Sequence, residues 1–148
     1  MGIVSRSRIK SPWLFLLNAS SCNGCVMEFL AALSPRYDAE RMGCVLVGTP
    51  RQADVLVIVG PVMRKMLPVV VRTYEQVPEP KAVVAVGSCA VSGGPFVGSY
   101  AFEGPLDDVI PVDVYVAGCP PKPEAIIRGI YEAVARKFKR GPGGEGNG

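Results

Sequence analysis

Short, continuous runs of apolar residues are the feature that most restricts the fold of this chain. Most residues in these runs are β-branched, and the runs end in glycine or another turn-forming residue. An apolar run without alternation is typical of a strand that is covered on both faces, as in parallel sheets. The predicted strands are residues 14–17, 45–47, 55–59, 83–86 and 112–116.

Helical patterns lie between these runs. Residues 25–33 form one predicted helix, and Pro68 suits the first turn of another that reaches about Gln76. The last predicted helix begins near Pro123, and its apolar residues recur at every fourth position as Ile126, Ile130, Val134 and Phe138. Strands that alternate with helices predict an α/β fold, with a mainly parallel sheet and helices on both faces.

The length and composition predict one domain. A chain of 148 residues, 49% of them hydrophobic, is long enough to bury a core. We expect an N-terminal extension at residues 1–12, a domain at 13–140 and a disordered, glycine-rich tail at 141–148. The apolar runs are far shorter than the roughly 20 residues that span a bilayer, so we expect no direct membrane span. Residues 1–10 lack the apolar segment of a signal peptide, which predicts a protein that stays in the cytoplasm.

Charge and cysteine content restrict the classes of function that this chain can have. The net charge is +3 with both signs interspersed, and basic residues do not alternate with aromatic ones, which argues against nucleic-acid binding. The chain has five cysteines and no histidine. Because structural disulfides are rare inside cells, these cysteines indicate metal or redox chemistry.

Four of the five cysteines follow predicted strands. Cys22 follows the first strand, with Cys25 three residues later, while Cys89 and Cys119 follow the last two. Ligand sites of parallel sheets lie beyond the carboxyl ends of the strands, so three loops are expected to bring these thiols together. Cys44 instead begins an apolar run after Gly43, and we predict that it is a small buried hydrophobe.

Three chemistries fit four thiols without histidine. Structural zinc usually takes two C-x-x-C pairs, and this chain has one. A thioredoxin-like dithiol formed by Cys22 and Cys25 leaves Cys89 and Cys119 unexplained. A [4Fe-4S] cluster uses all four, and the Cys119-Pro120 pair also occurs in ferredoxin-type ligation. Glycines beside the thiols favour the cluster, because they let backbone amides approach an inorganic core: Gly24, Gly87, Gly93, Gly94 and Gly118.

Five motifs in order resemble a known family, the small iron-sulphur subunit shared by membrane-bound [NiFe] hydrogenases and respiratory complex I. They are CNGCVME at 22–28, SPRYDAER at 34–41, GTPRQAD at 48–54, GSCA at 87–90 and IPVDVYVAGCPP at 110–121. The resemblance implies a flavodoxin-like domain that holds the proximal [4Fe-4S] cluster through Cys22, Cys25, Cys89 and Cys119. It also implies a role as a non-catalytic electron-transfer subunit on the cytoplasmic face of the membrane. Its expected partners are a large catalytic subunit, a ferredoxin-like subunit and membrane subunits.

The motifs combine features of two branches of the family. The two-residue gap between Cys22 and Cys25 resembles energy-converting hydrogenases, whereas the complex I subunits have adjacent cysteines. Val26 stands where those hydrogenases typically have aspartate, and it is as apolar as the complex I residue. The resemblance therefore favours an energy-converting hydrogenase, with a sulphur- or quinone-reducing relative of complex I as the alternative.

Several further residues are expected around the cluster. Gly24, Ser88 and Pro120 adjoin its cysteines in the sequence. Glu28 has a counterpart in both branches, and a buried carboxylate there would couple proton movement to electron transfer. The alternative is a first-turn glutamate favoured by a helix N-terminus. Arg51 is expected either to place a positive charge beside the cluster or to lie in a solvated loop.

Overall fold

The computed structural model describes residues 2–139 and contains a five-stranded parallel sheet. The sheet runs in the order β2 (Val45–Leu46), β1 (Trp13–Asn18), β3 (Val55–Val59), β5 (Ala82–Val86) and β7 (Val114–Val116). This order corresponds to the flavodoxin-like arrangement, in which the chain runs outward in both directions from the first strand. The predicted fold class is confirmed.

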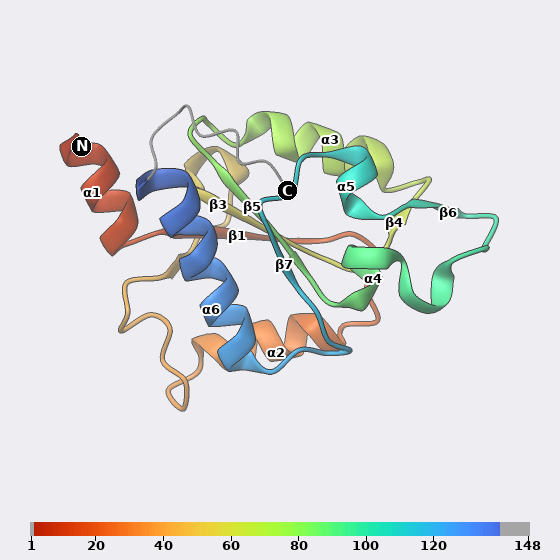
Figure 1. Ribbon diagram of the computed structural model, residues 1–148, viewed down its shortest axis with the longest axis horizontal. Coiled ribbons are helices and arrows are strands. Elements are labelled where there is room, and N and C mark those ends of the chain that lie inside the picture. The colour runs from red at the N-terminus through yellow and green to blue at the C-terminus, as the bar shows by residue number, and fades with distance from the viewer. Residues whose placement is uncertain (1, 140–148) are drawn as a thin grey trace.

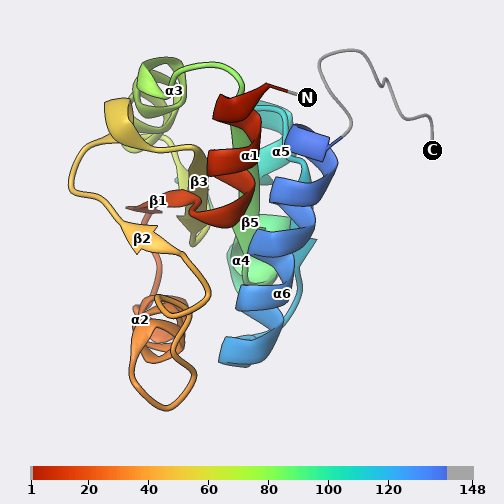
Figure 2. The same ribbon diagram turned by 90° about the vertical axis from the view of Figure 1, so that its left-hand side faces the viewer.

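Helices cover both faces of the sheet (Figures 1 and 2). Helices α2 (Gly24–Leu33) and α6 (Pro123–Val134) pack on one face, where Phe29 and Ile126 join the buried cluster that contains Val57. The opposite face is covered by α3 (Leu67–Gln76), α4 (Ser88–Ser92) and α5 (Leu106–Val109). Successive side chains of β3 alternate between these two cores, as strand geometry requires. The crossovers after β1 and β3 therefore lie on opposite faces.

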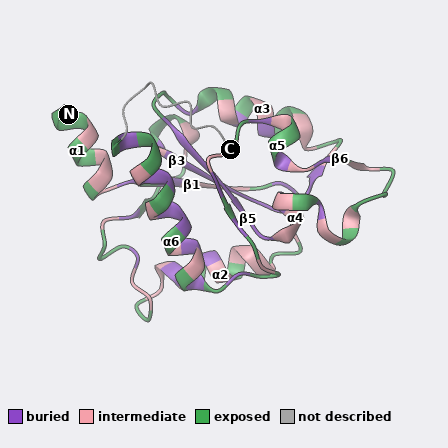
Figure 3. Cartoon of the chain, viewed as in Figure 1, coloured by how far each residue is buried: buried purple, intermediate pink, exposed green. Residues whose placement is uncertain are grey.

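Strands β3 and β5 are buried as predicted, whereas β1 is only partly buried and the edge strand β2 is exposed. Every residue of β3 and β5 is buried (Figure 3). Both residues of β2 are exposed, which corrects the prediction that this run is covered on both faces. The physical reason is position, because β2 pairs only with the start of β1, through Trp13 with Val45 and Leu14 with Leu46.

Three features were not predicted from the sequence. Helix α1 (Ile3–Lys10) lies in the expected extension, where Arg8 Nε is 3.0 Å from Asp54 Oδ1. Strands β4 (Val62–Met63) and β6 (Phe102–Gly104) form a separate antiparallel pair. Helix α6 continues as a π-helical turn at Ala135–Lys139, against which α1 packs. The expected tail at 141–148, like residue 140, lies outside the described residues.

Candidate iron-sulphur site

Four cysteines lie at the carboxyl end of the parallel sheet. Cys22 is in the loop after β1, and Cys25 is in the first turn of α2. Cys89 occupies the first turn of α4, directly after β5, and Cys119 follows β7. The beginnings of α2 and α4 and the loop after β7 meet at this end of the sheet (Figure 1). The parallel topology thus places residues far apart in the sequence beside one another.

The four thiols are close enough to influence one another electrostatically. Burial, followed by the charges of the other three thiolates and then of Glu28, raises the pKa of the Cys25 thiol to about 11. Burial also raises the pKa of Cys89, with further contributions from Cys119 and Cys22. Four mutually repelling thiolates in one place favour a bound cation or cationic cluster core that neutralises them.

Three glycines leave space beside the sulfur atoms. A Cβ atom at Gly87 would lie 2.5 Å from the Sγ of Cys25, which is too close for any side chain. A Cβ at Gly94 would lie 3.4 Å from the Sγ of Cys89, and one at Gly24 would lie 3.6 Å from the Sγ of Cys22. The backbone therefore approaches the thiols closely, and this arrangement of donors and space fits an iron-sulphur cluster.

Ser88 connects two of the cysteine loops. Its backbone N–H donates to the carbonyl oxygen of Gly118 at 2.9 Å, and its hydroxyl donates to the same oxygen at 3.2 Å. Pro120 packs beside Gly24, since a Cβ at Gly24 would be 3.9 Å from the Cβ and Cγ of Pro120. The structure thus places Ser88, Pro120 and Gly24, all predicted from the sequence, between or beside the thiols.

The two charged residues singled out from the sequence have different positions. Glu28, in the first half of α2, is near enough to Cys25 to raise the pKa of its thiol. Arg51 lies instead in a 3-10 helix, Pro50–Gln52, which precedes β3 and packs against α3 (Figure 2). The expectation of a charge beside the cluster is therefore wrong for Arg51 within this chain. After the short strand β2, the chain runs to the amino end of β3. This end of the sheet lies opposite to the end that carries the four thiols.

The loop that carries Cys22 is held by polar contacts that the sequence analysis missed. The side-chain oxygen of Asn18, at the end of β1, accepts a hydrogen bond from the backbone N–H of Ser21 at 2.7 Å. Its side-chain nitrogen donates to Oδ1 of Asn23 at 3.1 Å. An asparagine at a strand end, followed by small polar residues, indicates that its side chain bonds to the following turn, but it does not specify the partners.

Cys44 lies apart from the other thiols. It is 0% exposed, and its Sγ is 3.6 Å from the hydroxyl of Tyr131, which donates to the carbonyl oxygen of Met42 at 2.7 Å. Burial is the main cause that raises the pKa of Cys44, and none of the other cysteines contributes. The prediction of a small buried hydrophobe is confirmed.

The raised pKa of Cys44 predicts a loss of stability at alkaline pH. As pH rises above 9.0, the unfolded chain releases this proton before the folded chain does, so the free energy of unfolding falls. In the cluster-free chain, Cys44→Ala should show a smaller decline than wild type between about pH 8 and about pH 10, measured by urea unfolding. An equal decline in both proteins would contradict this assignment.

Within residues 2–139, no three His, Cys, Asp or Glu side chains are arranged to hold one metal ion. This finding concerns ligands gathered around a single ion. A [4Fe-4S] core would bind each of the four thiolates through a different iron atom, so it would not require three ligands around one ion. The chemistry and position of the donors, four thiols from three loops around glycine backbone, remain the features that fit a cluster.

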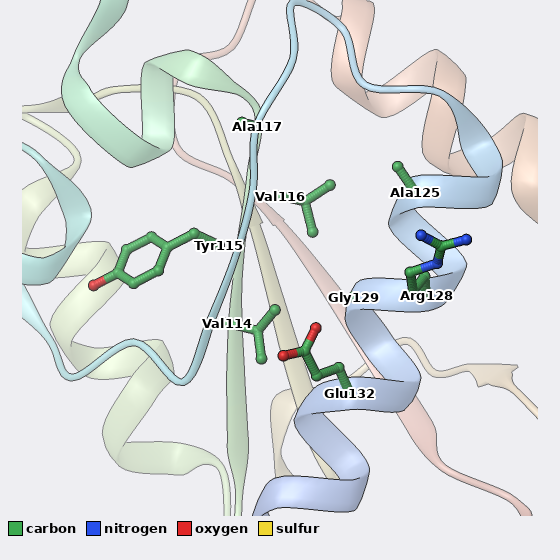
Figure 4. A pocket seen from close by; sticks show the side chains of 8 residues that line it. All are labelled: Val114, Tyr115, Val116, Ala117, Ala125, Arg128, Gly129 and Glu132. Carbon is green, nitrogen blue, oxygen red and sulfur yellow. The ribbon is translucent and has the colours of Figure 1, made fainter. Parts of the chain in front are cut away.

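A hollow of about 210 Å³ lies between β7 and α6, and it contains none of the four thiols (Figure 4). Val114 and Val116 point from the strand toward the helix, whose Gly129 permits close approach. Arg128 and Glu132 also line it.

No helix in the described part of the chain is long and apolar enough to cross a membrane.

Similar proteins share this chain's sequence over most of its length. The probable membrane-bound hydrogenase subunit mbhJ of Pyrococcus furiosus is 52% identical over 130 residues, covering 88% of this chain and 78% of that protein. An NADH-quinone oxidoreductase subunit of Herpetosiphon aurantiacus is 46% identical over 140 residues, covering 94% and 75%. A chain of the membrane-bound sulfane sulfur reductase, an archaeal respiratory membrane complex, is 39% identical with a TM-score of 0.80, covering 94% and 76%.

The flavodoxin-like fold and these matches define an electron-transfer subunit of an oxidoreductase. The family described as NADH ubiquinone oxidoreductase, 20 Kd subunit, matches residues 22–133. The chain belongs to this family, which confirms the resemblance found in the sequence motifs.

Proposed function

We propose that this chain holds one [4Fe-4S] cluster through Cys22, Cys25, Cys89 and Cys119 and passes single electrons within a membrane-bound complex. The observation that carries this proposal is the meeting of four thiols from three loops at one end of the sheet. A bound cluster supplies one-electron redox chemistry. The chain supplies the thiolates, the close glycine backbone and the partial burial of Cys25, while Cys22 and Cys119 are exposed.

The positions of Cys89 and Cys119 support the cluster over a dithiol enzyme. A thiol-disulfide enzyme of the C-x-x-C type uses the two cysteines of that pair, here Cys22 and Cys25. Cys89 and Cys119 both lie near enough to Cys25 to raise the pKa of its thiol, although a dithiol mechanism has no use for them. Metal ions bind the thiolate form of cysteine, so a bound cluster uses all four residues.

The chain itself acts as an electron relay, and a large subunit in the complex performs the chemistry. A ferredoxin-like iron-sulphur subunit and membrane subunits complete the assembly, with this chain peripheral on the cytoplasmic face. Support comes from two relatives whose names place them in membrane-bound complexes, a hydrogenase and a sulfane sulfur reductase.

An energy-converting [NiFe] hydrogenase is the complex that we favour. The spacing of Cys22 and Cys25 and the 52% identity to a hydrogenase subunit support this choice. A sulphur- or quinone-reducing complex is the second candidate. It is supported by the apolar Val26, which lies in α2 directly after Cys25, and by the similarity to chains of a sulfane sulfur reductase and an NADH-quinone oxidoreductase.

Purification of the whole complex through a tag on this chain tests the choice of branch. A hydrogenase should contain stoichiometric nickel and should evolve hydrogen from reduced methyl viologen. Nickel analysis and gas chromatography measure these two properties. A complex that lacks nickel and reduces polysulfide or a quinone instead would exclude the hydrogenase and support the second candidate.

A further inference from the structure

The loop between β1 and α2 contains backbone conformations that need support. Ser20 has a φ of 85° and Asn23 a φ of 71°, both in the left-handed region that L-residues seldom occupy. Cys22 lies between them, and Cys25 follows two residues after Asn23. Since such conformations persist only when their surroundings enforce them, the contacts of this loop determine where both thiols lie.

Asn18 makes the side-chain contacts that span this loop. Its Oδ1 accepts the backbone N–H of Ser21 at 2.7 Å, and its Nδ2 donates to Oδ1 of Asn23 at 3.1 Å. Ser21 completes the network, because its hydroxyl oxygen accepts the backbone N–H of Asn23 at 3.2 Å. One side chain on the rigid end of β1 thus contacts residues on both sides of Cys22.

The end of β3, the strand that pairs with β1, also contacts this loop. The backbone N–H of Ala19 donates to the carbonyl oxygen of Val59, the last residue of β3, at 2.8 Å. Gly60 follows with a φ of +90°, and a Cβ there would lie 2.5 Å from the backbone nitrogen of Ser21. The loop therefore packs directly against the end of β3, and the side chain of Asn18 connects Ser21 with Asn23 by hydrogen bonds.

The loop is also continuous with the start of α2. The carbonyl oxygen of Asn23 accepts the backbone N–H of Met27 at 2.9 Å, which makes Asn23 the residue at which the helix begins. A change in the orientation of Asn23 would therefore move Cys25 as well as Cys22. The bonds of Asn18 are exposed to solvent, so they contribute more to local order than to global stability.

We propose that Asn18 is a positioning residue that orders residues 20–23 and so presets the Cys22 and Cys25 thiols for the cluster, an inference that rests on the proposed function. Without Asn18, the fold should remain and the two thiols should lose their fixed geometry. The same site then binds its cluster less firmly and in more than one orientation.

Asn18→Ala in the full chain, reconstituted anaerobically with ferrous iron and sulfide, tests this inference. We expect an iron chelator to remove iron about fivefold faster than from wild type, as the loss of about one net hydrogen bond predicts. The electron paramagnetic resonance signal of the reduced protein should broaden, and the thermal midpoint of the cluster-free protein should stay unchanged. A merely structural role would move the midpoint and leave the signal as it is.

Two further variants make the test specific. Asn18→Asp keeps the acceptor for Ser21, and the Asn23 amide can turn to donate to it, so wild-type resistance to the chelator should return. Ser11→Ala removes a comparable side-chain bond, to the carbonyl oxygen of Gly43 at 2.9 Å, just before the other end of β1. This control should release iron at the wild-type rate.

Wild-type release rates and spectra in Asn18→Ala would overturn the inference, as would equally fast release from Asn18→Asp or Ser11→Ala. A measurement on the cluster-free protein tests the role of Asn18 independently of the proposed function. In cluster-free protein, Asn18→Ala should lower the NMR order parameters of the Ser21–Asn23 amides. If wild type takes up no cluster, the proposed function fails, and unchanged order parameters would overturn the role of Asn18 by themselves.

Discussion

Replacement of Cys89 or Cys119 by serine is expected to abolish stable cluster binding. Each thiol supplies one corner of the proposed cluster, and both lie near enough to Cys25 to raise the pKa of its thiol. Serine has nearly the same shape as cysteine but is a poor ligand for iron at neutral pH. The reconstituted variants should lack the brown absorbance that dithionite bleaches, and most of their iron should be lost on gel filtration.

Cys44→Ala is the matched control for these variants. It removes a cysteine that is buried and away from the other four thiols, so its iron content should equal that of wild type. Full iron content in Cys89→Ser or Cys119→Ser would contradict the proposed ligand set. A disulfide reductase activity that survives both substitutions would support the dithiol alternative through Cys22 and Cys25.

Gly87→Ala should impair cluster assembly almost as severely without removing any ligand. The new Cβ would lie 2.5 Å from the Sγ of Cys25, so the thiol or the backbone must move. Gly87 also has a φ of 92° and a ψ of 153°, a conformation that is open essentially only to glycine. We expect loss of most of the cluster and a decrease of about 1–3 kcal/mol in the free energy of unfolding.

Gly98→Ala separates the effect of backbone strain from the effect of the steric contact with Cys25. Gly98 has a φ of +88°, similar to that of Gly87, but a Cβ there would meet no atom within 4 Å. This variant should lose stability through backbone strain and keep its full cluster content. Iron analysis and urea unfolding of both variants measure the two effects. Equal iron content in the two variants would show that the space beside Cys25 is not needed for the cluster.

Some parts of the fold follow from the sequence because one local rule is enough to predict them. The run Val55–Val59 is apolar at every position and mostly β-branched, a pattern typical of a short strand buried on both faces. Pro68 and Pro123 lie in the first turns of α3 and α6, where the missing N–H costs no helical hydrogen bond. Helix α1 was not predicted, because it buries none of its own residues and has no apolar stripe.

Positions that depend on the path of the chain could not be predicted in the same way. Arg51 lies within a family motif, but the chain after the two-residue strand β2 places it before the amino end of β3. Asn18 is an ordinary residue at the end of a strand until the loop folds back over Gly60 and brings Ser21 and Asn23 within its reach. Both positions result from turns whose direction the local sequence does not specify.

The sequence by itself determined the parallel α/β fold, the family and the edge of the sheet at which four cysteines gather. These properties depend on apolar periodicity and on the rule that all carboxyl ends of parallel strands share one edge. Only the tertiary structure decided that Cys25 is the thiol with the strongly raised pKa, that Gly87 makes room for its sulfur and that Arg51 is remote. The physical reason is that burial, electrostatic interaction and steric contact depend on distances between residues far apart in the chain.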